Sequence, residues 1–224
     1  MKNLIFIPAR SGSKRLKNKN LINLKNKPLI YYTLEIAKKI KKKLKNTEII
    51  VSSDSNKIID YSNKILKTKN NYKRPKKFAT DKTTMVQTLT NLLNSLKNKK
   101  KEEPEIIITL QPTSPIRNIK DILKSINILK TNKKIESLVS ISKPIEEINN
   151  IVIKKKNYQL VSNQKKKFKY FKINGNFYVT RTKFILKKKK IFDYTKLTHF
   201  FEIKKNYSFD INEKFDLNLC EKII

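Results

Sequence analysis

The segment that follows the first apolar run of the chain carries side chains suited to holding phosphate. Between Pro8 and Asn20 it combines hydroxyl, cationic and glycine residues, namely Arg10, Ser11, Gly12, Ser13, Lys14, Arg15, Lys17 and Lys19. A glycine turn lets backbone N–H groups converge on an anion, and hydroxyl and ammonium groups can complete a cradle for triphosphate. The alternative is an ordinary basic loop in a lysine-rich chain, but the position after a strand and the Ser-Gly-Ser core favour a functional role.

This loop differs from two familiar phosphate-binding motifs. It lacks the G-x-x-x-x-G-K-[ST] spacing of a P-loop, and two of the three glycines of the dinucleotide fingerprint are missing. The pattern therefore predicts an anion cradle of another kind.

Four further blocks combine polar residues with turn-forming ones. They are Arg74-Pro75 with Asp81, Leu110-Gln-Pro-Thr-Ser-Pro-Ile-Arg117, Asn174-Gly175 with Tyr178, and Ser208-Phe-Asp210-Ile-Asn212 with Asp216. Together with Ile7–Lys14 and Lys19-Asn20, these blocks resemble, in order, the motifs of the acylneuraminate cytidylyltransferases, the CMP-sialic acid synthetase family. The resemblance spans residues 4 to 216, which is almost the whole chain.

The resemblance implies an enzyme that transfers CMP from CTP to the anomeric hydroxyl of a nine-carbon α-keto acid sugar and releases pyrophosphate. Negative charge builds up around phosphorus and on the leaving group, so positioned cations and Mg²⁺ would lower the barrier. Members of this family form homodimers in which an insertion of one subunit reaches the active site of its partner. We expect the same arrangement here.

The resemblance also assigns roles to particular residues. The triphosphate would be held by Arg10, Lys14 and Lys19. Of these, Lys14 would stabilise the leaving group. The nucleotide pocket would be formed by Ser11, Gly12, Ser13, Asn20 and Arg74, with its loop ordered by Asp81. The sugar acid would contact Gln111, Lys172, Asn174 and Tyr178. Arg117 would close its own loop rather than contact the substrate.

Two positions depart from the family pattern. The family metal loop carries two aspartates two residues apart, so that both face one side of an extended segment, whereas this chain has Asp210 and Asn212. Mg²⁺ prefers carboxylate, phosphate and water oxygens, so we expect a weaker metal site here, or one in which triphosphate supplies more ligands. Asn212 could also be a helix N-cap. Lys172 stands where relatives often carry Arg, and it loses the bidentate grip on a carboxylate.

Alternating strand and helix patterns must position these residues. Short apolar runs at 3–8, 48–53 and 105–110 predict buried strands, and apolar stripes at helical spacing predict helices over 29–44, 55–66, 86–96 and 119–129. This alternation predicts an α/β fold, and the resemblance narrows it to a Rossmann-like nucleotidyltransferase fold with a mostly parallel sheet and helices on both faces. Because ligands bind beyond the carboxyl ends of such strands, Pro8–Asn20, Ser52–Asp54 and Gln111–Arg117 should share one rim.

The pattern changes after residue 136. Short strands are expected at 137–142, 151–153 and 174–180, with a basic polar stretch at 154–172. We interpret residues 143–173 as a small insertion that serves as a dimerisation arm within a single domain of residues 1–224. A last helix is predicted over 213–224, with Asp210 or Asn212 as its N-cap.

The strong positive charge has two possible explanations. The chain has 53 Lys and Arg residues against 18 Asp and Glu, which gives a formal net charge of +35, but only 5 of the 53 are Arg. A nucleic-acid-binding protein would be expected to use more Arg, whose planar fork suits phosphate and guanine. Together with the abundance of Ile and Asn, this favours the codon bias of an AT-rich gene, and binding to nucleic acid is the less favoured interpretation.

Scarce residue types exclude several classes of protein. The single cysteine, Cys220, rules out a disulfide within the chain, and with a single histidine, His199, it cannot form a Cys/His zinc site. No G-x-S-x-G elbow is present, and no apolar run reaches the roughly 18 residues of a membrane span. We expect a cytoplasmic protein, with Cys220 in the core and His199 at the surface or an interface.

The sugar remains open between several acids. Sialic or legionaminic acid is favoured because Asn174-Gly175 stands where pseudaminic-acid relatives carry a different block, and Kdo-activating relatives lack the Q-P-T-S-P segment. Pseudaminic acid and Kdo are the alternative substrates. A catalytically weakened basic protein that binds nucleic acid is the alternative from another class, and it would show a steep salt dependence of binding.

Overall fold

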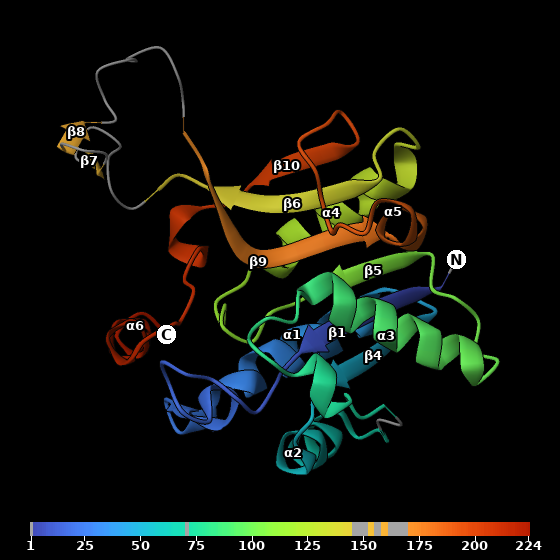
Figure 1. Cartoon of the computed structure of the whole chain (residues 1–224), viewed down its shortest axis with the longest axis horizontal. Helices are drawn as coiled ribbons and strands as arrows, with labels where there is room; N and C mark the ends of the chain where they lie inside the picture. The colour runs from blue at the N-terminus through green and yellow to red at the C-terminus, as the bar shows by residue number, and fades with distance from the viewer. Residues whose placement is uncertain (1, 70–71, 145–151, 155–157, 161–169) are drawn as a thin grey trace.

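The computed structural model describes residues 2–69, 72–144, 152–154, 158–160 and 170–224. A six-stranded sheet lies at its centre, with the strand order β10-β6-β9-β5-β1-β4 (Figure 1). The strands are β1 (Asn3–Pro8), β4 (Thr47–Ser52), β5 (Ile106–Thr109), β6 (Ser137–Ser142), β9 (Lys172–Arg181) and β10 (Thr198–Glu202). β1 is parallel to β4 and β5, and β10 is parallel to β6, whereas β9 is antiparallel to both of its neighbours. The mostly parallel sheet is confirmed.

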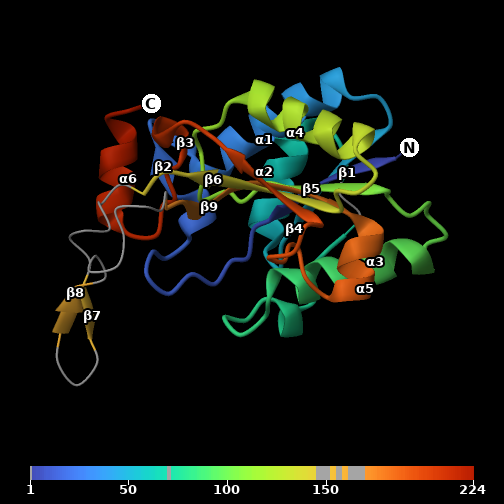
Figure 2. The same cartoon turned by 90° about the horizontal axis from the view of Figure 1, so that it is seen from above.

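Helices cover both faces of this sheet, as Figure 2 shows. They are α1 (Leu29–Lys43), α2 (Asn56–Leu66), α3 (Met85–Asn98), α4 (Ile119–Thr131), α5 (Thr182–Lys188) and α6 (Lys214–Glu221). Apolar residues of α1, α2 and α4 share one core cluster with one face of the strands. Those of α3 and α5 share a second cluster with the opposite face. None of the described helices is long and apolar enough to cross a bilayer.

The apolar run of β1 explains why this strand lies in the interior of the sheet. Ile5 and Ile7 pack in the cluster of α1, α2 and α4, while Leu4 and Phe6 pack in the cluster of α3 and α5. Successive side chains of a strand point to opposite faces, so a strand covered on both faces must be apolar at every position. The continuous apolar run of β1 therefore indicates a strand in the interior of the sheet.

Side-chain caps fix where several helices begin. Ser55 accepts a hydrogen bond from the backbone of Ile58 at the start of α2, and Thr84 and Gln87 form a capping box at the start of α3. The expectation for α6 was wrong: its N-cap is Glu213, not Asp210 or Asn212. The reason is that a carboxylate three residues further on, that of Asp216, accepts the backbone N–H groups of Asn212 and Glu213, both at 2.8 Å.

Some elements were not predicted from the sequence. These are the helix α5, the edge strand β10, the short hairpin of β2 (Asn23–Leu24) and β3 (Lys27–Pro28), and the 3-10 turns at Lys19–Leu21, Lys76–Phe78 and Lys205–Tyr207. Within the expected arm at 143–173, β7 (Val152–Lys154) and β8 (Tyr158–Leu160) form a separate antiparallel pair. Most of that arm lies outside the described residues. Cys220 is buried, as predicted, and His199 is exposed on β10.

Candidate functional site

The carboxyl ends of three parallel strands bring the predicted motifs to one rim of the sheet. Pro8 lies beside Ser52, and Phe6 lies beside Thr109, so the loops that follow β1, β4 and β5 start side by side. A cavity of about 240 Å³ opens there. Its lining includes seven of the predicted site residues, which are Arg10, Gly12, Ser13, Lys19, Asn20, Arg74 and Gln111.

Ser11 anchors the phosphate-binding loop instead of lining the cavity. Its backbone N–H donates to Oδ1 of Asp54 at 2.8 Å, and its hydroxyl donates to Oδ2 at 2.6 Å. Partial burial of Asp54 opposes ionisation, but the hydrogen bonds from Ser11 outweigh it and hold the pKa of Asp54 below its ordinary value. The carboxylate at the end of β4 therefore fixes the loop that follows β1.

Two of the predicted triphosphate-binding cations share one carboxylate. Arg10 Nη2 lies 2.5 Å from Oδ1 of Asp81, and Lys14 Nζ lies 3.0 Å from Oδ2. The hydrogen bonds from Lys14 and Arg10 lower the pKa of Asp81. Neither Lys14 nor Asp81 lines the cavity, and the Lys14 side chain is 82% exposed, so this three-residue group stands at the cavity mouth. Two cations that converge on one carboxylate can converge equally on phosphate.

Lys19 and Asn20 tie the loop to two other segments. The Asn20 side chain donates to the carbonyl of Arg10 at 2.8 Å, which holds the loop closed on itself. Lys19 Nζ donates to the carbonyl of Ile211 at 2.9 Å. Burial lowers the pKa of Lys19, against an opposing effect of the Asp210 carboxylate nearby. Lys19 therefore brings positive charge to the junction between the loop and the predicted metal segment.

Arg74 is buried at the wall of the rim cavity and is hydrogen-bonded to the end of β4. Its Nε donates to the hydroxyl of Ser52 at 3.0 Å, and its Nη2 donates to the Ser52 carbonyl at 2.6 Å. The backbone N–H of Arg74 also donates to the carbonyl of Ser53 at 2.8 Å. These bonds hold one side of the guanidinium against the strand while the residue lines the cavity.

Arg117 closes the Gln111–Arg117 loop from within. It is buried, and it donates to the carbonyl of Asn176 at 2.8 Å, to the hydroxyl of Thr33 at 2.9 Å and to the carbonyl of Gln111 at 2.5 Å. Burial lowers the pKa of Arg117 to about 9. All three acceptors are neutral, so this guanidinium holds together β9, α1 and the loop after β5.

A tight backbone approach brings the β9 turn against Gln111, which lines the cavity. Gly175 has a φ of +70°, and a Cβ at that position would lie 3.1 Å from Oε1 of Gln111 and 3.8 Å from the hydroxyl of Tyr178. Only glycine avoids both the strained conformation and the contact. Tyr178 stacks on Phe192 with ring centroids 6.1 Å apart, and burial raises the pKa of Tyr178 to about 12. The tyrosine is therefore a protonated hydroxyl at neutral pH.

Of the four predicted sugar-binding residues, Gln111 lines the cavity, whereas Tyr178, Asn174 and Lys172 lie outside its lining. Asn174 is buried, and its Oδ1 accepts hydrogen bonds from the hydroxyl of Ser140 at 2.7 Å and from the backbone of Asn176 at 3.1 Å. Its Nδ2 has no hydrogen-bond partner among the residues that the structure describes. Lys172 is exposed at the start of β9. The structure thus gives Asn174 a role in shaping the β9 turn and leaves Lys172 at the surface.

The predicted metal segment crosses beneath the loop after β5. The backbone of Ile211 donates to the carbonyl of Thr113 at 2.8 Å. Asn212 Nδ2 donates to Oδ2 of Asp210 at 2.9 Å, and its Oδ1 accepts from Arg15 Nη2 at 3.1 Å. The amide therefore stands where a second carboxylate would repel Asp210, and it links that carboxylate to a cation of the phosphate loop.

The oxygen ligands that this segment offers fit Mg²⁺ only when substrate phosphates supply further ligands. No cluster of three or more acidic, His or Cys side chains that could hold a metal exists among the described residues. Mg²⁺ is commonly held by one or two carboxylates together with substrate phosphates. Asp210 supplies one carboxylate, and Asn212 could supply an amide oxygen by exchanging Arg15 for the ion. These residues suit a cation that arrives with triphosphate.

Asp54 was predicted to lie on the rim but without a role, and no role was predicted for Asn176 or for Thr83, Met85 and Thr88, three residues that line the cavity. Asp54 holds Ser11, and Asn176 donates its amide to the carbonyls of Ile116 at 2.9 Å and Tyr207 at 2.7 Å. A signal existed for Asp54, because it directly follows a predicted buried strand and so had to lie on the rim. Asn176 lies within the Asn174–Tyr178 block, but its partners could not be read from spacing.

A basic loop after the first strand of a mixed α/β sheet, open to a cavity at the strand ends, is the arrangement expected of a Rossmann-like nucleotidyltransferase. Comparison with known proteins gives the family: residues 4–223 match the cytidylyltransferases, and the chain belongs to that family.

Individual relatives agree with this assignment. The chain is 32% identical to the CMP-N,N'-diacetyllegionaminic acid synthase of Legionella pneumophila, over 100% of this chain and 97% of that protein. It is 27% identical to the N-acylneuraminate cytidylyltransferase of Escherichia coli over 97% of this chain, and it spans only 51% of that longer protein. A solved CMP:2-keto-3-deoxy-manno-octonic acid synthetase, complexed with CTP, has the same fold, with a TM-score of 0.72 and 16% identity over 100% of this chain and 98% of that one.

Proposed function

We propose that this nucleotidyltransferase transfers CMP from CTP to the anomeric hydroxyl of a nine-carbon nonulosonic acid, sialic or legionaminic acid, and releases pyrophosphate. The observation that carries the proposal is the convergence of Arg10 and Lys14 on one carboxylate at the mouth of the rim cavity. The match to the legionaminic acid synthase along nearly the full length of both proteins supports the choice of sugar.

In the proposed reaction, the triphosphate replaces Asp81 as the partner of the two cations. Arg10 and Lys14 then neutralise charge on the phosphates, and Lys14 stabilises the departing pyrophosphate. Because Ser11 and Asn20 fix the loop in advance, little reorganisation accompanies the reaction. The sugar hydroxyl attacks the α-phosphate in line with the leaving group, and the protein contributes by positioning both substrates.

The sugar acid is proposed to bind between the loop after β5 and the β9 turn. Gln111 lines the cavity there, and a Cβ on Gly175 would contact both Gln111 and Tyr178. The Gln111 amide can donate or accept a hydrogen bond, and the protonated Tyr178 hydroxyl can donate one to a carboxylate or a sugar oxygen. Asn174 would act by shaping the turn.

Mg²⁺ is proposed as the cofactor, with Asp210 and Asn212 as its protein ligands. When bound, it would offset charge on the phosphates as a Lewis acid. Lys19 and Arg15 lie beside this segment and would share in that task.

A homodimer is proposed from the β7–β8 pair. This pair stands outside the central sheet (Figure 1), and an isolated two-stranded hairpin is marginally stable in water. Packing against a second subunit would supply the burial that it lacks.

We also propose that the enzyme is cytoplasmic, because the proposed reaction consumes CTP, a cytoplasmic metabolite.

The test is release of pyrophosphate with CTP and Mg²⁺ in the presence of N-acetylneuraminic, legionaminic, pseudaminic or Kdo sugar, with ATP, GTP and UTP as controls. Release with CTP and sialic or legionaminic acid supports the proposal. Pseudaminic acid is the second candidate, because the chain is 35% identical to the pseudaminic acid cytidylyltransferase of Campylobacter jejuni over 127 residues. If neither the wild-type protein nor the Asn212→Asp variant released pyrophosphate with any of these sugars, the proposal would be refuted.

A further inference from the structure

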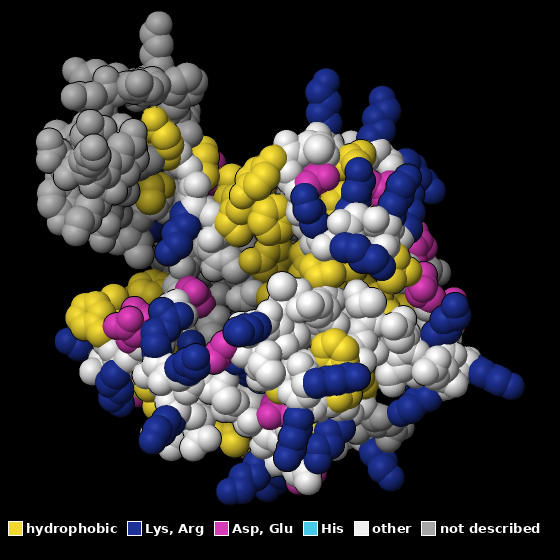
Figure 3. Space-filling model, in the orientation of Figure 1, with side chains coloured by type: hydrophobic (Ala, Val, Ile, Leu, Met, Phe, Trp, Pro, Cys, Tyr) yellow, Lys and Arg dark blue, Asp and Glu magenta, His cyan; other side chains and the backbone are white. Residues whose placement is uncertain are grey.

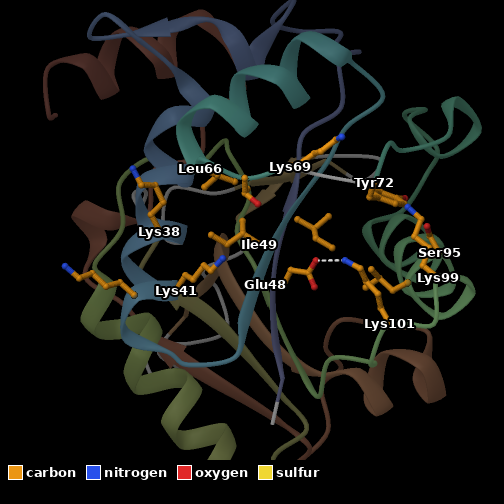
Figure 4. A pocket seen from close by; sticks show the side chains of 14 residues that line it. Lys38, Lys41, Glu48, Ile49, Leu66, Lys69, Tyr72, Ser95, Lys99 and Lys101 are labelled. Carbon is orange, nitrogen blue, oxygen red and sulfur yellow. Dashed lines mark hydrogen bonds and ion pairs between the residues drawn. The ribbon is translucent and has the colours of Figure 1, made fainter.

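A second cavity lies beside the outer edge of β4, away from the strand ends that carry the phosphate loop. It has a volume of about 360 Å³, which lies within the usual range of small-molecule sites. Its lining comes from the second half of α1, the first half of β4, the end of α2 and the end of α3 (Figure 4). No residue that lines the rim cavity, which we call the nucleotide cavity because CTP is proposed to bind there, lines this one.

The floor of this cavity is apolar and its rim is cationic. The floor is formed by Ile49, Ile50, Leu66, Leu96 and the ring of Tyr72. Six lysines line it, Lys38, Lys41, Lys42, Lys69, Lys99 and Lys101, and Glu48 alone is acidic among the described lining residues. An apolar floor with charged groups at the rim is the composition of a ligand site rather than of a solvated surface.

Ion pairs within the protein do not neutralise this rim. Glu48 is already contacted by Lys101 at 3.0 Å and by Lys2 at 3.6 Å. The side chains of Lys41, Lys42 and Lys69 are exposed and form no hydrogen bond or ion pair with another described residue. At least three unmatched positive charges therefore surround one cavity, where their mutual repulsion favours an anion.

Local stability accounts for only part of this arrangement. Lys41 and Lys42 lie in the last turn of α1, where cations interact favourably with the helix C-terminus. Lysines also discourage pairing at an open strand edge such as that of β4. Neither effect requires Lys69, which follows α2, to line the same cavity, nor the cavity itself.

We propose that this cavity binds a small organic polyanion whose flat or apolar body covers the floor. Its phosphate, sulfonate or carboxylate groups would be held by Lys41, Lys42 and Lys69, and the hydroxyls of Thr68 and Ser95 line the same space. Tyr72 lies two residues before Arg74, which lines the nucleotide cavity. An occupant would thus bind close to the nucleotide site without entering it.

The experiment uses the full chain and a fluorescent flat polyanion, pyrene-1,3,6,8-tetrasulfonate, at physiological ionic strength. Binding is followed by fluorescence anisotropy. The triple variant Lys41→Gln, Lys42→Gln, Lys69→Gln is compared with the control Lys120→Gln, Lys134→Gln, Lys187→Gln, whose three lysines are exposed and line neither cavity. Both variants lose the same net charge, so an effect of total charge is identical in the two.

We expect the cavity variant to weaken binding at least tenfold and the control variant to change it less than threefold. Amide chemical shifts of the wild-type protein should move at residues 48–50, 66–69 and 95–101 on addition of the probe. Equal weakening in the two variants would show attraction to net charge alone and overturn the proposal. Shifts confined to residues 10–20, with full displacement of the probe by CTP, would also overturn it. Neither readout depends on the proposed transfer activity.

Discussion

Asp81 holds the two phosphate-loop cations as a substrate phosphate would. Because Arg10 and Lys14 both contact its carboxylate, an incoming triphosphate must displace it. Exposed ion pairs are weak, because solvent screens them. We therefore expect Asp81→Asn to tighten binding of inorganic triphosphate up to about fivefold, measured by calorimetry. Asp60→Asn, an exposed acid on α2, is the control for net charge. Weaker binding in Asp81→Asn would show that ordering of its loop matters more than competition.

Asp54 makes the opposite kind of contribution, since it fixes the loop rather than competing with substrate. Asp54→Asn removes a charged acceptor from the backbone and hydroxyl of Ser11, and hydrogen bonds to charged groups contribute about 1.5–3 kcal/mol. We expect a lower free energy of unfolding and a CTP KM raised at least tenfold. Ser11→Ala should cost less, because it keeps the backbone bond. An unchanged KM in Asp54→Asn would contradict the anchoring role.

The pH dependence of this anchor follows from the lowered pKa of Asp54. A carboxyl whose pKa is lower in the folded than in the unfolded state stabilises the fold above its unfolded pKa. This stability is lost as the pH falls through the folded pKa, below the ordinary value of 3.8. The anchor is therefore complete at neutral pH.

Asn212 keeps the metal segment stable without a metal. Its Nδ2 donates to Asp210, so Asn212→Asp would place two carboxylates together and raise the need for a cation. We expect the variant to have a lower Tm than the wild type in EDTA, and a Tm that rises more steeply with Mg²⁺ in the presence of CTP. Thermal unfolding detects this without any turnover. Identical Mg²⁺ responses in the two proteins would exclude residue 212 from the metal site.

At the scale of elements, the β9 turn depends on one glycine. Gly175→Ala would force a side chain into the left-handed region, which costs roughly 1–2 kcal/mol, and would place its Cβ 3.1 Å from Gln111. We expect reduced stability in denaturant unfolding and a raised KM for the sugar acid. Gly12→Ala is the matched control for stability, because a Cβ at Gly12 meets nothing within 4 Å. Equal stability of both variants would contradict this account of the turn.

The elements that could be predicted are those whose pattern is local. Continuous apolar runs indicate the buried strands at 3–8, 48–53 and 105–110. Periodic apolar residues indicate the amphipathic helices between them. α5 has seven residues and β10 has five, which is too short for a periodic signal. The antiparallel direction of β9 is set by its long-range pairing with β5 and β6, and no local pattern encodes it.

The same distinction applies to the candidate site. Arg10, Lys14, Lys19 and Asn20 could be predicted together because one loop carries them. The contact of Ser11 with Asp54 joins residues 43 positions apart, and that of Arg117 with Asn176 joins residues 59 apart. Such contacts depend on the sheet order and not on the spacing within a motif. The chemistry could therefore be predicted before the residues that hold it in place.

At the scale of the whole molecule, the positive charge is dispersed over one face (Figure 3), although six lysines also line the second cavity. On the face in Figure 3, lysine and arginine side chains are scattered over the surface and interrupted by acidic groups. Proteins that bind nucleic acid concentrate such residues in a stripe or patch. The distribution on the face in Figure 3 fits a bias in composition better than a surface for nucleic acid, and the net charge of +35 makes self-repulsion a property of the whole fold.

Self-repulsion and ion pairs predict opposite effects of salt on stability. The ion pairs of Asp81, Lys38 and Lys101 are open to solvent, so each is weak and salt would weaken it further. The excess of 35 positive charges repels throughout the molecule, and salt screens this repulsion because the Debye length falls from about 30 Å at 0.01 M to about 8 Å at 0.15 M. Repulsion should dominate, since many more like-charged pairs than ion pairs lie within that range. We expect Tm to rise between 0.01 and 0.15 M NaCl, measured by calorimetry at constant pH. A falling Tm would show that the few ion pairs outweigh the net charge.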